Sequence, residues 1–342
     1  MRRVRVSGAG GDCEIAVGES ISSLEEYCRG ARTVIVTDAN VKKHQGAKFP
    51  DCEVLEVGTG EGAKKLSTVE SLYRKFLDIE LDKSCMVVGI GGGVVSDITG
   101  FAASTYLRGV PFGFVPTTLL AQVDASIGGK NGVNLEGYKN IIGTIRQPRF
   151  VLCDPGTLST LPERELRCGF AEVVKHAAIA DAGLFSYLEK NAGRALSLEP
   201  EAMLRVLEDS VAVKAKIVSV DEEEKGERMK LNFGHTIGHA IEKTAGMPHG
   251  EAVAAGMVAE SEIAVRMGLM ERNHSERLSA LLLSLGLPAA VKAPREGIAD
   301  AIRKDKKRRS EKVLMPVLNG IGSCRIAEVE LKKLEGALDA VC

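Results

Sequence analysis

The sequence predicts an α/β protein of two domains: an amino-terminal domain built around a parallel sheet and a mainly α-helical carboxyl-terminal domain. In the first half, short β-branched runs alternate with helical patterns, which is typical of a parallel sheet. After the turn-rich stretch 154–162, strand patterns become rare and a 3.6-residue periodicity continues to about residue 287. We therefore expect the domains to comprise residues 1–155 and 156–342.

The individual elements follow from the same patterns. The expected strands are 33–37, 52–56, 85–90, 112–115 and 150–153. Between the second and third strands, segment 67–81 has the apolar spacing of a crossover helix that covers one face of the sheet. Its apolar positions are Val69, Leu72, Phe76 and Leu77. Near the carboxyl terminus, runs 313–317 and 324–327 are separated by the glycine-rich segment 319–322 and predict one hairpin before a closing helix.

The charge balance limits the classes of partner. The 342 residues carry 45 Lys and Arg against 46 Asp and Glu, so the formal net charge is −1. Such a balance provides no overall field that would attract DNA or an anionic membrane. Aromatic residues make up 4% of the chain and Trp is absent, which leaves few stacking platforms for single-stranded nucleic acid. Any anion that the protein binds must therefore be held locally.

The cysteines indicate the compartment. The eight cysteines form no CxxC pair and show no regular spacing, so neither a disulfide framework nor a zinc ribbon is indicated. No run approaches the roughly 18 apolar residues that a membrane span requires. We expect a soluble, cytoplasmic protein.

A glycine-rich turn follows the most apolar expected strand. Gly91, Gly92 and Gly93 separate this strand from a helical pattern that begins at Val94. Glycines before a helix let a phosphate approach the helix N–H groups. The dinucleotide fingerprint GxGxxG is absent, so nucleotide binding and a plain tight turn both remain open. Asp38, which ends the first expected strand, could bind a ribose or cap a turn.

The segment 116–140 mixes polar residues, glycines and apolar side chains after an expected strand. Its polar members include Asp124, Lys130, Lys139 and Asn140. Loops at the carboxyl ends of parallel strands line ligand crevices, and lysines on such loops suit phosphate or carboxylate groups. The segment is therefore a candidate binding loop, and the alternative is a solvated surface loop.

Three of the six histidines, His235, His239 and His249, lie within fifteen residues. The first two are four residues apart on a helical pattern, so we expect both rings on one face, where a divalent metal or an anion could bind. The zinc-protease motif HExxH is absent. Arg228 and Asn232 are expected to extend the same helical face. The alternative is a solvated face with incidental histidines.

A carboxylate could complete a metal site with two of these histidines. Glu172 lies in an otherwise apolar helical stretch, and a buried carboxylate there needs a metal or cation partner. Lys175 and His176 lie one turn further on. Each could join the cluster, or be a snorkelling lysine and a core histidine, respectively.

In these segments the chain resembles the 3-dehydroquinate synthase family of the sugar phosphate cyclase superfamily. The resemblance covers nearly the whole length. The matching blocks are 91–97, 116–118, 124–140, 169–175, 231–242 and 305–307. It implies a Rossmann-like NAD-binding domain, a helical domain that binds Zn²⁺ or Co²⁺, and an active site in the cleft between them.

The resemblance also implies a role for individual residues. Glu172, His235 and His249 would bind the metal, and His239 would contact the substrate phosphate. The residues implied to contact the substrate's hydroxyls and carboxylate are Asp124, Lys175, Lys214, Arg228 and Asn232. Those implied near its phosphate are Lys130, Asn140 and one lysine of block 305–307, taken as Lys307. Arg108 would come from the partner subunit of a homodimer. The implied NAD contacts are Asp38, Asn40, Glu61, Lys64, Gly92, Gly93, Asp97, Thr117, Thr118, Lys130, Lys139, Thr157 and Thr160.

The implied reaction converts 3-deoxy-D-arabino-heptulosonate 7-phosphate to 3-dehydroquinate and phosphate, a step of the shikimate pathway to aromatic amino acids. A metal ion would polarise a hydroxyl of the substrate while NAD accepts a hydride, and the resulting ketone would acidify the adjacent C–H for elimination of phosphate. Return of the hydride, ring opening and an intramolecular aldol closure would complete the turnover.

Three positions depart from the family pattern. Asn131, Tyr138 and His176 stand where Thr, Gly and Tyr are frequent, and none of these changes removes a catalytic group. They leave open a sister cyclase that acts on sedoheptulose 7-phosphate or glucose 6-phosphate. Such substrates lack the carboxylate for which Lys214 and Arg228 provide cations, which argues against this alternative.

Two further alternatives belong to other classes. A metal-dependent polyol or glycerol phosphate dehydrogenase would release NADH, and the block 124–140 argues against it. A polyanion-binding protein would depend on the run 303–309, in which six of seven residues are basic. A run of charge in a balanced chain is typical of a solvated loop, so we expect no nucleic-acid partner.

Overall fold

The structure is a computed structural model that describes residues 2–28, 30–292, 294–303, 308–309 and 311–342. The chain divides into two compact units, Met1–Pro162 with Lys214–Glu222, and Glu163–Val213 with Glu223–Cys342. No helix among the described residues is long and apolar enough to cross a membrane.

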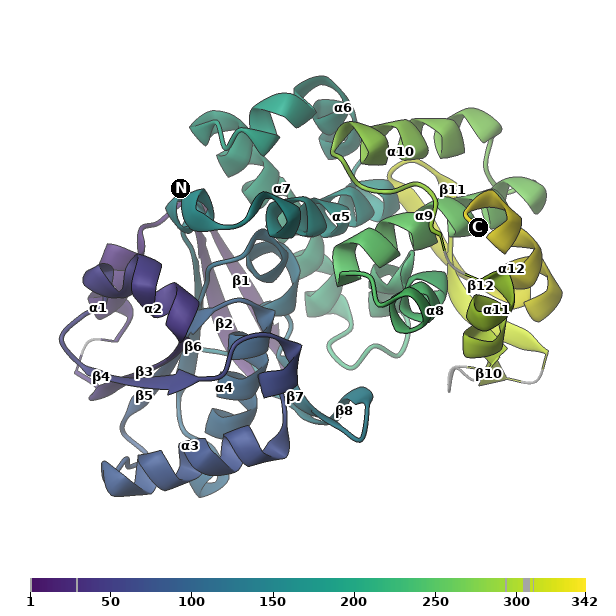
Figure 1. The fold of residues 1–342 in the computed structure, drawn as a ribbon. Coiled ribbons are helices and arrows are strands. Elements are labelled where there is room, and N and C mark those ends of the chain that lie inside the picture. Colours follow the sequence, from purple (N-terminus) through teal and green to yellow (C-terminus); the bar gives the residue numbers. More distant parts are fainter. Residues whose placement is uncertain (1, 29, 293, 304–307, 310) are drawn as a thin grey trace. The chain divides into compact units, whose positions relative to one another are not determined.

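The first unit contains a seven-stranded sheet with the strand order β1-β2-β9-β6-β5-β3-β4 (Figure 1). Apart from the amino-terminal hairpin β1–β2, its strands are the parallel β3 (Thr33–Asp38), β4 (Glu53–Val57), β5 (Met86–Gly91), β6 (Phe112–Pro116) and β9 (Phe150–Cys153). These are the five strands that the sequence predicts, and both the α/β class and the parallel arrangement are confirmed. β3 and β5 are neighbours, yet the chain leaves β3 for β4 on one side and leaves β5 for β6 on the other. The sheet therefore has a topological switch point at the carboxyl ends of β3 and β5.

An antiparallel hairpin that the sequence analysis does not predict extends the sheet. It consists of β1 (Arg2–Gly8) and β2 (Gly11–Val17), and β2 pairs in parallel with β9. β1 is exposed at five of its seven positions, whereas Ile15, Ala16 and Val17 of β2 are buried. Because a charged edge strand lacks an apolar run, its sequence carries little strand signal.

The helices of the first unit cover an apolar sheet. They are α1 (Leu24–Tyr27), α2 (Ala39–Gln45), α3 (Leu66–Asp78) and α4 (Gly93–Thr105). Alternate residues of β5, including Val88 and Ile90, join a core cluster with Leu24 of α1, while α4 packs against β3, β5 and β6. α3 is the predicted crossover helix. The predicted packing of Leu77 against the sheet is wrong, because this side chain is 63% exposed. It is the penultimate residue of α3 and points to solvent, whereas Val69, Leu72 and Phe76 are buried.

The segment expected to be a binding loop is largely regular structure. A short π-helical turn (Ala121–Ala125) leads into a separate hairpin of β7 (Lys130–Leu135) and β8 (Tyr138–Ile145). The expectation of a loop is wrong, because the two strands pair with each other. Gly132 and Gly143 lie opposite each other in this pairing. A Cβ added to either would come within 2.7 Å of a backbone oxygen of the facing strand, so glycine here permits close pairing.

The second unit is mainly helical, as the sequence predicts. Its helices are α5 (Glu163–Ala180), α6 (Ala182–Leu196), α7 (Pro200–Val220), α8 (His235–Ala245), α9 (His249–Arg266), α10 (Arg272–Ser284), α11 (Arg295–Arg303) and α12 (Leu331–Ala337). The last residues of α7, from Lys214 onward, belong to the first unit. α9 is central, since it contacts α5, α8, α10 and α12. Eight of its 18 residues are Gly, Ala or Ser, including Ala254, Ala255 and Gly256, which allows neighbouring helices to approach closely.

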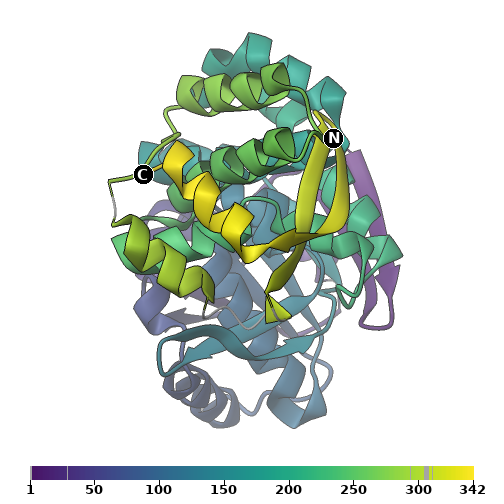
Figure 2. The ribbon, with the colours of Figure 1, turned by 90° about the vertical axis from the view of Figure 1, so that its right-hand side faces the viewer.

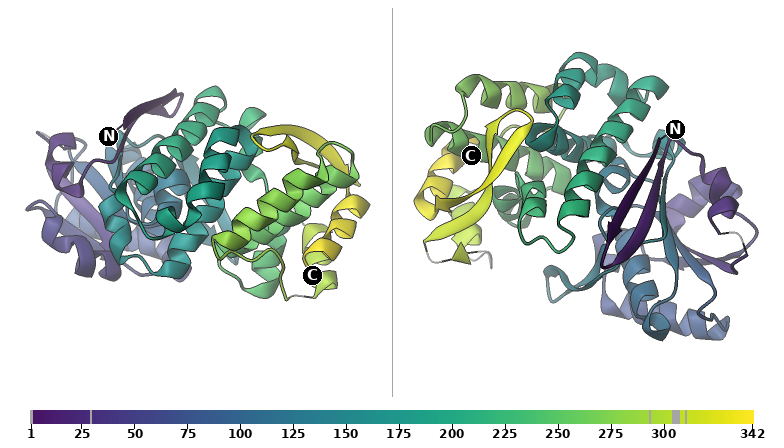
Figure 3. Two further views of the ribbon diagram at one scale, coloured as in Figure 1. Left: turned by 90° about the horizontal axis from the view of Figure 1, so that it is seen from above. Right: turned by 180° about the vertical axis from the view of Figure 1, so that it is seen from behind.

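The carboxyl-terminal hairpin is also as predicted. β11 (Lys312–Gly320) and β12 (Ser323–Glu330) pair in antiparallel order beside the short β10 (Arg308–Arg309) and appear as the long yellow strands of Figure 2. The closing helix α12 follows β12 directly, and Figure 3 shows the same hairpin from behind.

Candidate functional site

A buried carboxylate lies in the middle of α5. Glu172 is 0% exposed, and Lys175, one turn further on, is 1% exposed and forms an ion pair with it. Spacing of three residues places both side chains on one helix face. An ion pair buried to this extent is costly unless further polar groups stabilise it, so Glu172 and Lys175 mark a site with additional partners.

Two histidines from other helices face Glu172. His235 is the first residue of α8 and His249 the first residue of α9. Their Nε2 atoms lie 3.7 Å and 3.5 Å, respectively, from Oε1 of Glu172, and one ligand atom from each of the three residues lies within 4.8 Å of the others. The structure therefore brings together the three residues that family resemblance assigns to the metal.

Each histidine is oriented through its other ring nitrogen. Nδ1 of His235 hydrogen-bonds to the backbone oxygen of Phe233 at 3.1 Å, and Nδ1 of His249 to the carboxylate of Glu242 at 3.2 Å. Partners of this kind are typical of metal-binding histidines, because they leave Nε2 to bind the ion. Glu242 has no role predicted from the sequence, since no local pattern links it to a histidine seven residues away.

The two imidazoles have opposite pKa shifts. Burial, reinforced by the positive charge of Lys175, lowers the pKa of His235 well below its usual value, so its ring is neutral. Burial also lowers the pKa of His249, but hydrogen bonds and attraction from Glu172 and Glu242 outweigh this and raise it to about 9. The protonated ring of His249 thus provides a positive charge next to Glu172, where a bound metal ion would also provide one.

The donor set fits a catalytic metal ion. Two imidazole nitrogens and one carboxylate are ligands that zinc takes in catalytic sites, with a position left for water or substrate. A tetrahedral ion with bonds of roughly 2.0–2.1 Å separates its ligand atoms by about 3.3 Å, close to the distances between Glu172 and the histidines.

A second group of potential ligand atoms shares one of these histidines. His239, Glu242 and His249 also lie within 4.8 Å of one another. In this group His239 is exposed, and Glu242 is already engaged by Nδ1 of His249. We therefore favour the group that contains Glu172. The ring of His239 lies 5.1 Å from that of His235, so the two predicted neighbours are on one face of α8.

The expectation that Arg228 and Asn232 continue this helical face is wrong. They lie in a 3-10 turn (Glu227–Asn232), and α8 begins only after Gly234, whose φ of +80° breaks the helical path. Arg228 is buried, and Asn232 donates a hydrogen bond to Glu224. The 3-10 turn, and not α8, therefore positions both residues.

His176 proves to be a core residue. It is completely buried, and its ring hydrogen-bonds to the hydroxyl of Ser210 on α7 at 2.8 Å. Of the two readings left open by the sequence, the core histidine is the one that the structure favours. Lys175, by contrast, does not snorkel to solvent.

The first unit contains the predicted nucleotide turn. β5 ends at Gly91 and α4 begins at Gly93. A Cβ on Gly91 would lie 2.6 Å from Val95, and one on Gly92 would lie 3.0 Å from Thr118. The turn therefore needs glycine at position 91, and it exposes the N–H groups at the start of α4 beside the carboxyl end of β6.

Asp38 lies at the carboxyl end of β3, the strand next to β5, and thus at the switch point. Its Oδ1 accepts hydrogen bonds from the backbone N–H groups of Asn40 and Val41 at 2.9 and 3.0 Å. Asp38 therefore caps α2. A contact with a ribose, as predicted, would be made by the same carboxylate while it also caps the helix.

Several other residues assigned to NAD come together in one network. Lys64 is buried and forms an ion pair with Asp97 of α4. Glu61 accepts a hydrogen bond from the amide of Asn134 at 2.7 Å, and Asn134 in turn accepts one from the backbone of Asn140 at 2.9 Å. Asn134 has no role in the sequence analysis, because it forms these contacts only once β7 pairs with β8.

The remaining assigned residues of this unit lie near the same strand ends. The N–H of Thr117 donates to the backbone oxygen of Gly91 at 2.9 Å, and buried Thr157 accepts a hydrogen bond from Gln122 at 3.1 Å. The side chains assigned to NAD or phosphate in this unit that are exposed to solvent are Asn40, Glu61, Lys130, Lys139, Asn140 and Thr160.

A second ion pair between assigned residues lies in the first unit. Lys214, near the end of α7, is buried and pairs with the carboxylate of Asp124 in the π-helical turn. Two residues assigned to the substrate, 90 positions apart in the chain, are thereby in contact.

Arg108 lies apart from these groups in the hydrogen bonds and ion pairs described. Arg108 is exposed, and both it and Leu107 have positive φ values of 65° and 50°, a strained conformation for residues other than glycine. Lys307 lies outside the described residues, as does the whole of block 305–307.

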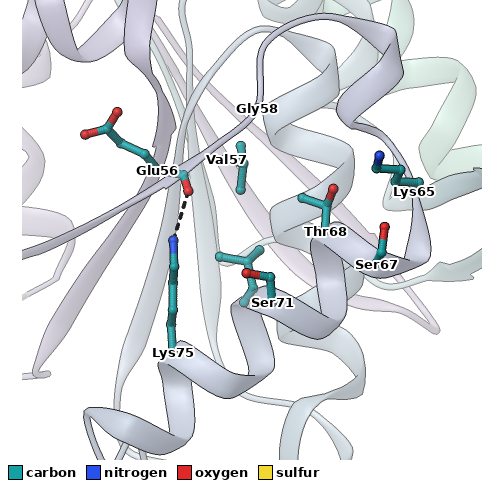
Figure 4. Close-up of a pocket in the computed structure, with 9 residues that line it drawn as sticks. Glu56, Val57, Gly58, Lys65, Ser67, Thr68, Ser71 and Lys75 are labelled. Carbon is teal, nitrogen blue, oxygen red and sulfur yellow. Dashed lines mark hydrogen bonds between the residues drawn. The ribbon is translucent and has the colours of Figure 1, made fainter.

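A pocket of about 290 Å³ lies where β4 leads towards the first turns of α3 (Figure 4). On one side, Lys75 donates a hydrogen bond to the backbone oxygen of Glu56 at 3.1 Å. The lining residues are Glu56, Val57, Gly58, Lys65, Ser67, Thr68, Ser71, Leu72 and Lys75. None of them is a predicted site residue, so this pocket is separate from the candidate site.

Comparison with known proteins shows what the chain is similar to. Residues 54–168 match the family model of the 3-dehydroquinate synthase N-terminal region, and residues 169–308 match that of the C-terminal region. A 3-dehydroquinate synthase of Geobacter sp. (strain M21) is 45% identical over 287 residues, which cover 83% of this chain and 78% of that protein.

Two solved structures are similar over almost their full length. A 2-deoxy-scyllo-inosose synthase complexed with carbaglucose-6-phosphate, NAD⁺ and Co²⁺ is 27% identical, with a TM-score of 0.88 and coverage of 98% of this chain and 99% of that one. A 2-epi-5-epi-valiolone synthase of Streptomyces hygroscopicus subsp. jinggangensis 5008, with NAD⁺ and Zn²⁺ bound, is 30% identical, with a TM-score of 0.88 and coverage of 99% and 98%.

Proposed function

Since this chain belongs to the 3-dehydroquinate synthase family, we propose that it converts 3-deoxy-D-arabino-heptulosonate 7-phosphate to 3-dehydroquinate and phosphate. It is then a carbon–oxygen lyase that uses NAD and a divalent metal ion within each turnover. The observation that carries the proposal is the convergence of Glu172, His235 and His249 in a chain whose relatives at this level of identity have this activity.

The metal site is proposed to consist of Glu172, His235 and His249. Zn²⁺ or Co²⁺ bound there would supply a Lewis acid for the substrate hydroxyl that is oxidised. In this role Glu172 needs a fixed position, and the buried ammonium group of Lys175 holds one of its oxygens while the other faces the histidines.

The cations of the site are proposed to bind the acidic groups of the substrate. Arg228 and Lys214 are both almost inaccessible to solvent, and a buried cation gains most from an anionic ligand that replaces lost hydration. Lys214 also has Asp124 beside it, so this pair can orient a hydroxyl group of the substrate. Lys130, Asn140 and His239 are proposed near the phosphate, because they are exposed polar side chains able to meet an incoming anion.

NAD is proposed to bind at the switch point of the first unit. The glycine turn before α4 would receive the pyrophosphate, while Asp38 would contact the ribose. The Lys64–Asp97 pair and Glu61 would hold the remaining part of the cofactor. Support comes from the two similar solved structures, each of which contains NAD⁺.

A sister cyclase is the second candidate, because both similar solved structures have such activities. Their identities of 27% and 30% are well below the 45% shared with the 3-dehydroquinate synthase of Geobacter. The higher identity favours the heptulosonate, whose carboxylate matches the buried cations. A cytoplasmic homodimer in which Arg108 serves the partner's site is part of the proposal.

The test is release of phosphate from 3-deoxy-D-arabino-heptulosonate 7-phosphate with catalytic NAD, with and without a chelator, and with sedoheptulose 7-phosphate in parallel. We expect chelator-sensitive turnover of the heptulosonate alone and no net NADH. Turnover of sedoheptulose 7-phosphate instead would assign the protein to a sister cyclase, and accumulation of NADH would indicate a dehydrogenase.

A further inference from the structure

We propose that Glu260, a buried residue of α9, is a positioning residue for the metal ligand His235. The inference rests on the metal site proposed above and adds a residue that contacts none of the three ligand side chains in the hydrogen bonds described. Glu260 is 1% exposed. Its Oε2 accepts a hydrogen bond from the N–H of Gly234 at 2.8 Å, and its Oε1 accepts one from the N–H of Ile237 at 3.1 Å.

These two hydrogen bonds provide acceptors for backbone N–H groups at the start of α8. The first N–H groups of any helix lack partners within the helix, and the residue before the helix commonly caps them with its side chain. Here that residue is Gly234, which has no side chain and adopts a left-handed conformation. Glu260 provides the cap from another helix, and a carboxylate there also opposes the positive end of the helix dipole.

The capped N–H groups lie on both sides of the metal ligand. His235 is the first residue of α8, between Gly234 and Ile237. Its ring is held in turn by the hydrogen bond from Nδ1 to the backbone of Phe233. Glu260 therefore fixes the backbone from which the ring projects, and with it the direction in which Nε2 points towards Glu172.

The same helix also carries the other histidine ligand. His249 begins α9, and Glu260 lies eleven residues later on it, so one helix presents one ligand and holds the start of the helix that presents the other. Between the two helices the backbones are in direct contact, because a Cβ on Gly256 would lie only 2.0 Å from the oxygen of Gly234. The 5.3 Å between the rings of His235 and His249 is thus set by this helix pair.

A carboxylate is needed at position 260 because both of its oxygens accept hydrogen bonds. A glutamine of the same shape has one acceptor oxygen and an NH₂ group that donates. In Glu260→Gln, one backbone N–H would face another donor, and a buried donor without an acceptor is costly. We expect the start of α8 to shift and His235 to lose its alignment.

The experiment measures Co²⁺ binding to the full chain, not turnover. The dissociation constant and the visible absorption spectrum of bound Co²⁺ are compared for the wild type, Glu260→Gln and the control Ser261→Ala. Ser261 is the next residue of α9 and is equally buried, but its hydroxyl bonds to Val258 and to Ser275 of α10. The control thus breaks a buried hydrogen bond of α9 away from α8.

We expect Glu260→Gln to bind Co²⁺ roughly 10- to 100-fold more weakly with an altered spectrum, the range typical for residues that orient metal ligands. Ser261→Ala should retain the wild-type affinity and spectrum even where its thermal stability falls. Wild-type affinity in a folded Glu260→Gln variant would overturn the proposal.

A second variant covers the case in which Glu260→Gln does not fold. Glu260→Asp retains the charge but is one methylene too short to reach both N–H groups, so we expect weaker Co²⁺ binding here as well, and unchanged binding would count against the proposal. If the wild type itself binds no Co²⁺, the proposed metal site fails. That outcome is distinct from unchanged binding in the Glu260 variants.

Discussion

At the residue scale, the candidate metal site depends on which nitrogen each histidine directs inward. His235 and His249 use Nδ1 for a backbone oxygen and a carboxylate, respectively, so that both Nε2 atoms face Glu172. The neutral His235 is ready to bind a metal, whereas His249 must lose a proton first. Metal binding should therefore weaken as the pH falls.

The first prediction tests the ligand set. Replacing Glu172, His235 or His249 with Ala removes one of three protein ligands and should weaken Zn²⁺ binding by more than about 100-fold, beyond the effect expected for residues that only orient ligands. Metal content after dialysis, measured by atomic emission, provides the readout. His239→Ala is the matched control and should retain metal, because His239 belongs only to the exposed alternative group. Loss of metal in His239→Ala with retention in Glu172→Ala would reverse the assignment.

The second prediction concerns the pH dependence of stability. Burial raises the pKa of Asp97 to about 6, although the neighbouring Lys64 lowers it. The folded protein thus binds this proton more tightly than the unfolded chain, whose value is near 3.8. The resulting stabilisation is fully present below that value and is lost as the pH rises through about 6.

Asp97→Asn does not titrate and serves as the reference. The free energy of unfolding of the wild type, minus that of Asp97→Asn, should fall between about pH 4 and pH 7, as measured by urea denaturation at several pH values. A difference that stays constant over this range would show that the pKa of Asp97 is not raised in the folded protein.

At the scale of elements, glycines determine how closely α8 and α9 approach. Gly234, Gly238 and Gly256 lie at their contact, and a Cβ at any of them would meet backbone atoms of the other helix within 3.0 Å. Backbone atoms cannot move aside as the end of a flexible side chain can. This contact therefore holds the two histidine-bearing helix starts at a fixed separation.

The third prediction uses a pair of glycine substitutions. Gly256→Ala should destabilise the protein by about 1–3 kcal/mol, because its Cβ would overlap the backbone oxygen of Gly234. Gly193→Ala, within α6, should stabilise the protein by about 0.5–1 kcal/mol, since a Cβ there would meet nothing within 4 Å and alanine favours a helix. Thermal and urea unfolding give both values, and equal effects of the two substitutions would contradict the argument.

At the scale of the whole molecule, the two proposed cofactor sites divide between the two units. All residues assigned to NAD lie in the first unit, and all three assigned metal ligands lie in the second. Each unit has its own buried apolar core, which includes Val88 and Phe114 in one and Phe170 and Phe233 in the other. No assigned residue is shared between the two cofactors.

The fourth prediction follows from this division. Removal of the metal with a chelator should change the dissociation constant of NAD by less than about threefold. The metal can change NAD affinity only if it alters residues that bind NAD, and the two assigned sets share no residue. Isothermal titration of NAD into metal-loaded and metal-free protein measures this. A change of tenfold or more would show that the two units communicate.

The sequence by itself determined the parallel strands β3, β4, β5, β6 and β9, the helix α3 and the carboxyl-terminal hairpin, because local periodicity indicates these elements. The five parallel strands, α3 and the carboxyl-terminal hairpin each have an apolar repeat or a turn signal within a few residues. Residue patterns indicated the histidine cluster, Glu172 and the glycine turn, and family resemblance added individual roles and the residues Lys64 and Thr157, for which no local pattern indicates a role. Their grouping with Asp97 and Gln122 became visible only in the structure.

Only the tertiary structure decided features that depend on distant partners. The exposed edge strand β1 and the hairpin β7–β8 lack a long apolar run and form by pairing with neighbouring strands. The break at Gly234 separates Arg228 from α8 despite helical spacing. The contacts of Glu242 with His249 and of Glu260 with the start of α8 likewise join residues 7 and 26 positions apart. A sequence pattern reports the periodicity of one segment, whereas such contacts arise when separate segments pack together.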